Sequence, residues 1–165
     1  MHAGHVESAV AVLINYRKHV IVPNVSWGLG LNHECDMLIL DGQNRFTEVE
    51  IKVSASDLKA DFKKEHGHKS RFISRLIYAM PIELCEKYKD LIPAHCGIIA
   101  IREFNPWGYE IPGYKAEWFR MCKHDKTKEK PSPQTIRKFF ELGCMRIWTL
   151  KSHNNNRNAK AKNKS

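Results

Sequence analysis

The segment between residues 34 and 81 constrains the fold of this chain more than any other, because its hydrophobic period changes twice. It begins with two β-rich runs, ECDMLIL and RFTEVEIKV, which the turn sequence DGQN joins into a predicted hairpin. The period then changes to that of a helix over residues 55–66, and RLIYAM at residues 75–80 reads as the next strand. A strand followed by a helix and a second strand indicates a parallel crossover, so the sequence predicts an α/β fold.

Other elements follow from the same patterns on either side of this segment. We expect helices and strands in the following order: a helix over residues 6–19, a strand over 19–24 cut by a proline, a helix over 82–91, a strand over 96–103, an irregular arm or short hairpin over 105–131, and a helix over 132–151. The last stretch, SHNNNRNAKAKNKS, is polar and basic and has no apolar anchors. We therefore predict one domain over residues 1–151 and a disordered basic tail over 152–165.

The length of the hairpin loop decides which side chains face each other. A three-residue loop, Gly42 to Asn44, with Asn44 in the left-handed conformation, pairs residues whose numbers add to 86. In that register Asp36 lies opposite Glu50, with Lys52 one pleat further along on the same face. A loop of two or four residues would send Asp36 to the other face.

Two carboxylates in this arrangement have two possible meanings. An alternating strand such as TEVEIKVS is often only the solvated side of a sheet, and Glu34, opposite Lys52, favours a plain cross-strand ion pair. Asp36, however, interrupts an apolar run, and like charges that face each other destabilise a sheet unless a cation bridges them. Oxygen ligands of this kind suit Mg²⁺ or Mn²⁺, and a nearby lysine can orient a water molecule or hold a phosphate.

The net charge of the chain indicates which class of molecule it binds. Its 27 Lys and Arg residues exceed its 18 Asp and Glu residues, which gives a formal charge of +9 and a pI near 9.4. Such an excess indicates a polyanion, and nucleic acid is the commonest one. The five scattered cysteines form no CxxC pair, which argues for free thiols and against a structural zinc site. No apolar run reaches the roughly 18 residues of a membrane helix, so we expect a cytoplasmic protein that does not enter membranes.

Two longer motifs carry a resemblance to a known family. Asp36 followed by Glu50-Ile-Lys52 resembles the PD-(D/E)xK nuclease superfamily, and EIKVSASDLKADFK (50–63) with RLIYAMP (75–81) is similar to its MmcB-like DNA-repair branch. The resemblance implies a restriction-endonuclease-like three-layer sandwich, in which helices flank a central mixed β-sheet with an αβββαβ core. It also implies metal ligands at Asp36 and Glu50, a catalytic lysine at Lys52 and a first-helix glutamate near the metal, for which Glu7 is the matching candidate.

Residues after the ExK motif suggest supporting roles. Ser54 is a candidate helix cap, and Asp57 and Asp61 either charge the helix or support Lys52. The segment KKEHGHKSR that follows is suited to contacts with DNA phosphates, and we assign this role to its residues Lys63, Lys64, His68, Lys69 and Arg71. Aromatic residues between 107 and 119 could stack on unpaired bases, but packing on the domain is the more common role of such residues.

These observations lead to one principal hypothesis and two alternatives. The principal one is a Mg²⁺-dependent deoxyribonuclease, an endonuclease that hydrolyses phosphodiester bonds of branched or single-stranded DNA intermediates in repair or recombination. The first alternative is a non-catalytic DNA-binding module on a nuclease fold. The second is a basic structural protein with a coincidental motif. The pattern leaves the oligomeric state open.

Overall fold

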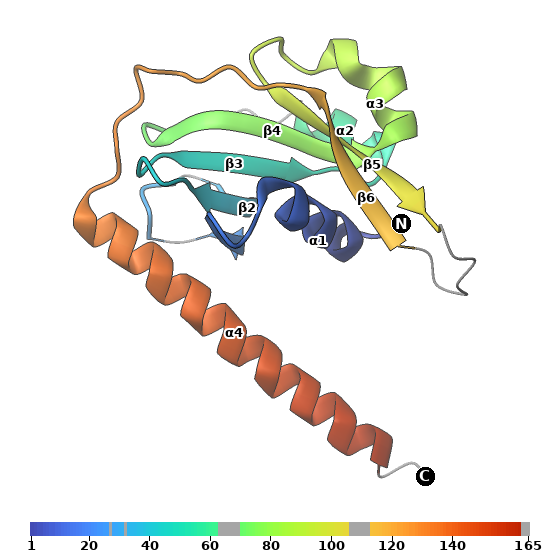
Figure 1. The fold of residues 1–165 in the computed structure, drawn as a ribbon, viewed down its shortest axis with the longest axis vertical. Coiled ribbons are helices and arrows are strands. Elements are labelled where there is room, and N and C mark those ends of the chain that lie inside the picture. Colours follow the sequence, from blue (N-terminus) through green and yellow to red (C-terminus); the bar gives the residue numbers. More distant parts are fainter. Residues whose placement is uncertain (27, 32, 63–69, 106–112, 163–165) are drawn as a thin grey trace.

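The computed structural model describes residues 1–26, 28–31, 33–62, 70–105 and 113–162, and the side chains of this part as far as residue 155. It contains a six-stranded mixed sheet flanked by helices (Figure 1). Its strands are β1 (Val20–Val25), β2 (Cys35–Leu40), β3 (Phe46–Ile51), β4 (Ile73–Pro81), β5 (Gly97–Phe104) and β6 (Gly113–Arg120). Its helices are α1 (Ala3–Ile14), α2 (Ala55–Asp61), α3 (Ile82–Tyr88) and α4 (Pro133–Lys162), with a short 3₁₀ turn at Lys89–Leu91.

The strands follow one another across the sheet in the order of the sequence. β1, β2 and β3 pair antiparallel, β3, β4 and β5 pair parallel, and β5 and β6 pair antiparallel. The predicted parallel crossover from β3 to β4 is therefore confirmed, as is the order helix, three strands, helix, strand. Pro23 does not cut the first strand, because β1 lies at the edge of the sheet, where a missing N–H is tolerated.

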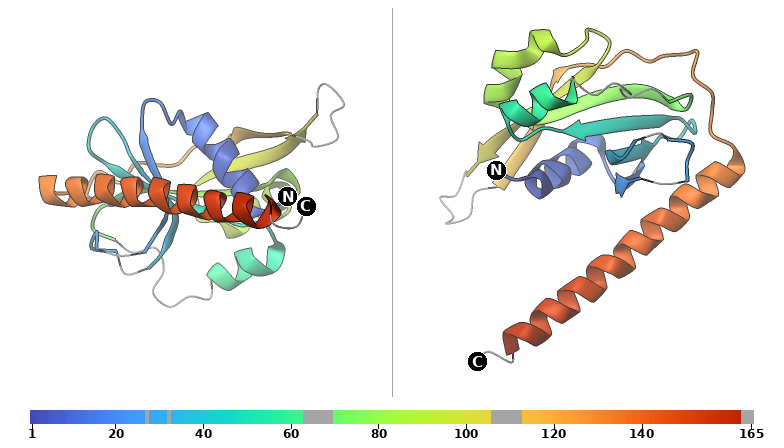
Figure 2. Two further views of the ribbon diagram at one scale, coloured as in Figure 1. Left: turned by 90° about the horizontal axis from the view of Figure 1, so that it is seen from below. Right: turned by 180° about the vertical axis from the view of Figure 1, so that it is seen from behind.

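Helices cover both faces of the sheet, which makes three layers (Figures 1 and 2). On one face α1 buries Val6 and Val10 against strand residues such as Val49 and Ile77. On the other face α2 and α3 contribute to a cluster that includes Leu58. The start of α4 adds a further cluster on that face, in which Phe139, Leu38, Leu40 and Phe46 pack together. The prediction of an α/β three-layer sandwich is thus confirmed.

Two predictions about the second half of the chain have different outcomes. Of the two alternatives for residues 105–131, the hairpin is the one observed, because β6 pairs antiparallel with β5. Helix α4 passes through Gly143 and continues to Lys162, so residues 152–162 of the expected disordered tail are helical. Extending an existing helix avoids the unfavourable nucleation step, so even a polar segment without anchors can continue it.

Gly143 has a packing role rather than that of a helix end. A Cβ atom at this position would lie 3.2 Å from Cγ2 of Val22 on β1. The absence of a side chain therefore lets α4 approach the edge strand closely. Beyond this contact α4 points away from the sheet (Figure 1), and Trp148 on it is 68% exposed.

Candidate metal-dependent site

The hairpin of β2 and β3 has the register predicted from its loop. Met37 pairs with Val49, and Leu40 pairs with Phe46, so the residue numbers add to 86. Asn44 has the left-handed conformation that a three-residue loop requires, with φ of 58°. One position beyond the pair of Met37 and Val49, the same register brings Asp36 opposite Glu50.

Asp36 is fixed by the backbone of the neighbouring strand. Its Oδ2 atom accepts a hydrogen bond of 2.7 Å from the N–H of Ile51. This bond holds the carboxylate at the end of β3, between the positions of Glu50 and Lys52. All four residues line a cleft of about 390 Å³.

Glu7 of α1 lines the same cleft, although almost thirty residues separate it from Asp36 in the sequence. Burial raises the pKa of Glu7, and the negative charge of Asp36 raises it further. This electrostatic effect requires the two carboxyl groups to be close in space. The first helix therefore contributes a carboxylate to the cleft formed by the hairpin.

Lys52 lies in a buried chain of polar contacts. Its Nζ atom is 2.8 Å from Oε2 of Glu50 and 3.1 Å from Oδ1 of Asp61. The hydroxyl of Tyr78 donates a hydrogen bond of 3.1 Å to the other oxygen of Asp61. Burial alone would lower the pKa of Lys52, but the charges of Glu50 and Asp61 outweigh it and raise this pKa above its ordinary value. The ammonium group is therefore charged at neutral pH and held at two points.

The protonation of Glu50 is strongly perturbed. Its pKa is raised from 4.5 to about 7, mainly by burial; the charge of Lys52 opposes the rise, and the charge of Asp36 adds to it. A carboxyl group in this condition exchanges its proton near neutral pH. Strongly perturbed acids in a cleft are characteristic of functional sites.

Comparison with known proteins identifies the family. The family model described as DNA repair protein MmcB-like matches residues 2–154. The chain belongs to the MmcB-like DNA repair protein family. Among solved structures, a protein of unknown function from Silicibacter pomeroyi has a similar fold, with a TM-score of 0.63 and 18% sequence identity over 96% of this chain and 94% of that one. A comparison with curated proteins gives no match. In the described part of this MmcB-like chain, no helix is both long and apolar enough to cross a bilayer.

The residues predicted to support the MmcB-like site differ in what they do. Ser54 caps α2, because its Oγ accepts a hydrogen bond of 3.2 Å from the N–H of Asp57. Asp57 lines the cleft, and Asp61 is buried and contacts Lys52 directly. Leu58 anchors α2 in the core, and it thereby fixes the position of Asp61. Of the two alternatives given for Asp61, its position beside Lys52 favours the supporting one.

Three polar residues near the site were not predicted to be part of it. Tyr78 lies beside Glu50 in the parallel pairing of β3 and β4, and this pairing can be inferred once the crossover is recognised. Glu48 is completely buried, and its Oε1 atom is 2.6 Å from Nε2 of His33. Its position two residues before Glu50, on the same face, is the sequence signal that it belongs to this polar group.

The ion pair expected between Glu34 and Lys52 is replaced by others. Within the described residues, the ion pairs of Lys52 are formed with Glu50 and Asp61. Glu34 is exposed and lines the cleft. The reason is that the crossover helix brings Asp61 over the end of β3, and a buried ammonium is stabilised more by buried carboxylates than by an exposed one.

The predicted DNA-binding segment is described only in part. Lys63, Lys64, His68 and Lys69 lie outside the described residues. Arg71 is exposed; its guanidinium lies 4.5 Å from the centroid of the Phe72 ring and 3.9 Å from a carboxylate oxygen of Glu129. Phosphate binding by this segment therefore stays a prediction.

The aromatic residues of the second half are likewise described in part. Trp107 and Tyr109 lie outside the described residues, whereas Tyr114 and Trp118 are partly buried against the core on the α1 face. Arg120 donates hydrogen bonds to backbone carbonyls, including that of Cys96 at 3.0 Å. Tyr114 and Trp118 therefore pack at least in part on the domain, whereas Phe119 is exposed.

Proposed function

We propose that this MmcB-like protein is a metal-dependent DNA endonuclease of the PD-(D/E)xK type that acts in DNA repair. The observation that carries the proposal is the convergence of Glu7, Asp36, Glu50 and Lys52 on one cleft. The DNA repair family and the formal charge of +9 support DNA as the substrate.

The donor atoms of the cleft fit a hard divalent cation. Five carboxyl side chains line it, and among its described lining residues Lys52 is the one basic side chain. The raised pKa values of Glu7 and Glu50 express this excess of negative charge in a partly buried space. Glu7, Asp36 and Glu50 would hold Mg²⁺ or Mn²⁺, which prefer oxygen ligands. When bound, the cation would lower the pKa of a water molecule and polarise a phosphate oxygen.

Lys52 has the chemistry to act on the reacting groups. Its fixed ammonium can donate a hydrogen bond to the attacking water or to a non-bridging oxygen of the scissile phosphate. In the hydrolysis the water oxygen forms a bond to phosphorus and loses a proton, while the bond from phosphorus to the leaving oxygen breaks and that oxygen takes up a proton. Asp61, held by Tyr78, positions Lys52 for this role.

The experiment compares cleavage of supercoiled plasmid and branched DNA by wild type and by Lys52→Met in Mg²⁺ or Mn²⁺. The variant keeps the unbranched stem of the side chain and removes the ammonium. Lys115→Met is the matched control, because Lys115 is an exposed lysine on β6. Circular dichroism and thermal unfolding verify that each variant is folded.

We expect cleavage by wild type and by Lys115→Met, and a loss of about a hundredfold or more with Lys52→Met, which is the usual scale for a lost electrostatic group at a reacting centre. Equal cleavage by wild type and Lys52→Met would overturn the assigned chemistry. Salt-sensitive DNA binding that needs no divalent cation, without cleavage by any form, would instead identify a non-catalytic DNA-binding module.

A further inference from the structure

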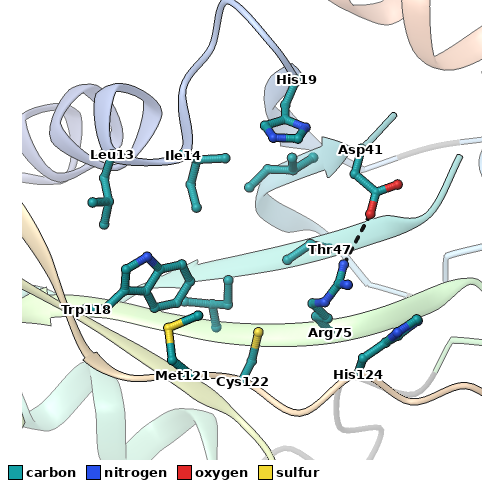
Figure 3. Close-up of a pocket in the computed structure, with 12 residues that line it drawn as sticks. Leu13, Ile14, His19, Asp41, Thr47, Arg75, Trp118, Met121, Cys122 and His124 are labelled. Atoms are coloured by element: carbon teal, nitrogen blue, oxygen red, sulfur yellow. Dashed lines mark hydrogen bonds and ion pairs between the residues drawn. The ribbon is translucent and has the colours of Figure 1, made fainter. Parts of the chain in front are cut away.

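A second cavity lies away from the candidate metal site, on the face of the sheet that α1 covers (Figure 3). It has a volume of about 560 Å³, within the range of small-molecule sites. Asp41 lines it at one end of β2, whereas Asp36 lies at the other end. The two acids are five positions apart, which corresponds to about 17 Å along a strand. The two sites are therefore distinct.

One half of this cavity is apolar and contains an indole ring. Leu13 and Ile14 reach from α1 toward Trp118 of β6, and Ile39 and Ile77 contribute from the sheet (Figure 3). Trp118 is only partly buried. Its ring can therefore pack against a flat, weakly polar group that enters the cavity.

The other half of the cavity is polar. The guanidinium of Arg75 is 3.2 Å from a carboxylate oxygen of Asp41, and the imidazoles of His19 and His124 lie near this pair (Figure 3). Burial lowers the pKa of His124, and the positive charges of Arg75 and Arg45 lower it further. The carboxylate of Asp41 opposes this shift. An anion in this half of the cavity would therefore have Arg75 as its cationic partner, beside the ion pair with Asp41.

Two buried nitrogen atoms in this half have no hydrogen-bond partner among the described residues. They are Nδ1 of His19 and Nε2 of His124. A polar atom that is buried in this way is costly unless a ligand or a water molecule satisfies it. Both imidazoles border the same cavity, so a ligand there would lie beside both rings.

We propose that this cavity binds a nucleotide, with the base against Trp118 and the phosphate at Arg75 and His124. An aromatic wall suits a base of any sequence, and an arginine with neighbouring imidazoles suits a phosphate. The nucleotide has two possible sources, a free mononucleotide or the unpaired terminal nucleotide of a DNA strand. This binding requires neither the divalent cation nor the catalysis proposed for the cleft at Glu50.

The experiment is a calorimetric titration of the full chain, in a chelating buffer, with 2′-deoxyadenosine 5′-monophosphate, deoxyadenosine, inorganic phosphate and a short 5′-phosphorylated oligonucleotide. The variants are Arg75→Gln, which removes the positive charge of the guanidinium, Trp118→Leu, which removes the indole ring, and His124→Gln, which removes the imidazole beside Arg75. Arg137→Gln is the matched control, because Arg137 is an arginine with an exposed side chain that pairs with Glu141 on α4. Glu50→Gln tests independence from the metal site.

We expect the mononucleotide to bind more tightly than deoxyadenosine or phosphate. Arg75→Gln should weaken its binding about tenfold or more, the scale of a lost charge-assisted contact. Trp118→Leu should weaken it about fivefold or more, the scale of a lost base stack. His124→Gln should also weaken it, while Arg137→Gln and Glu50→Gln should not. Tighter binding of the oligonucleotide than of the mononucleotide, again lost in Arg75→Gln, would identify the strand end as the source, and the reverse order would identify the free nucleotide.

Two results would overturn the proposal. One is the absence of saturable nucleotide binding at millimolar concentration. The other is equal binding by wild type, Arg75→Gln and His124→Gln. The two proposals fail separately. In wild type, nucleotide binding without DNA cleavage would contradict the proposed nuclease alone, and DNA cleavage without nucleotide binding would contradict the proposed nucleotide site alone.

Discussion

Replacement of Glu50 by glutamine should stabilise the metal-free protein at pH 8 and leave its stability almost unchanged near pH 4.5. The pKa of Glu50 rises from 4.5 to about 7 on folding, mainly because the group is buried. Between these pH values the folded state keeps a proton that the unfolded state loses, so the free energy of unfolding falls as the pH rises through this window. The difference between the two pKa values corresponds to about 3 kcal/mol at pH 8.

Glutamine imitates the protonated carboxyl group and can still accept a hydrogen bond from Lys52. It therefore removes the cost of ionisation and should raise the melting temperature at pH 8 by about 6 to 12 °C for a domain of this size. The assay is thermal unfolding followed by circular dichroism at pH 5 and pH 8, with a chelator present. Glu86→Gln, at an exposed position on α3, is the control.

A melting temperature of Glu50→Gln no higher than that of wild type at pH 8 would contradict a cost of ionising Glu50 in the folded state. An equal difference in melting temperature at both pH values would also contradict it, because the effect would then be unrelated to the titration of Glu50. The expected result has a functional meaning. A carboxylate that lowers stability at neutral pH is better explained by a task in the cleft than by a structural role.

Three further predictions concern the cation, the support of Lys52 and the anchor of α4. Mg²⁺ should raise the melting temperature more at pH 8 than at pH 6, because the cation competes with the proton on Glu50; an equal rise at both pH values would argue against Glu50 as a ligand. Tyr78→Phe should lower the free energy of unfolding by about 1 kcal/mol through loss of the hydrogen bond to Asp61, and should slow DNA cleavage; full activity would remove Tyr78 from the positioning of Lys52. In chemical denaturation, Phe139→Ala should lower the free energy of unfolding by about 3 to 5 kcal/mol, whereas Trp148→Ala, at an exposed position, should change it by no more than about 0.5 kcal/mol. Similar changes for both variants would contradict the packing of α4.

Local patterns in the sequence were sufficient to predict the part of the site that lies on the hairpin. The Asp-Gly turn and an asparagine that tolerates a left-handed conformation specify the loop, and the loop specifies that Asp36 faces Glu50. Ser54 as a cap followed from the spacing of residues within one helix turn. These features depend on residues close together in the chain, so the sequence determines them directly.

Contacts between distant segments could not be obtained in the same way. Glu7 reaches the cleft only because α1 packs across the sheet, and its distance from Asp36 depends on the whole core. The burial of Glu48 with His33 and the contact between Asp61 and Tyr78 depend on how α2 and the loop before β2 are placed. An alternating strand looks the same in sequence whether its polar face meets solvent or a buried polar network.

The turn at Gly42 to Asn44 has a consequence for how this protein can change in evolution. It lies at the end of the hairpin remote from the cleft, yet its residue count sets which side of β2 carries the acid. Point substitutions there should be tolerated as long as position 44 accepts a positive φ. A one-codon insertion or deletion should not be tolerated, since it would move every side chain of one strand to the opposite face of the sheet unless a compensating bulge restored the register. Selection on catalysis would then act on the genetic length of a surface turn that takes no part in chemistry.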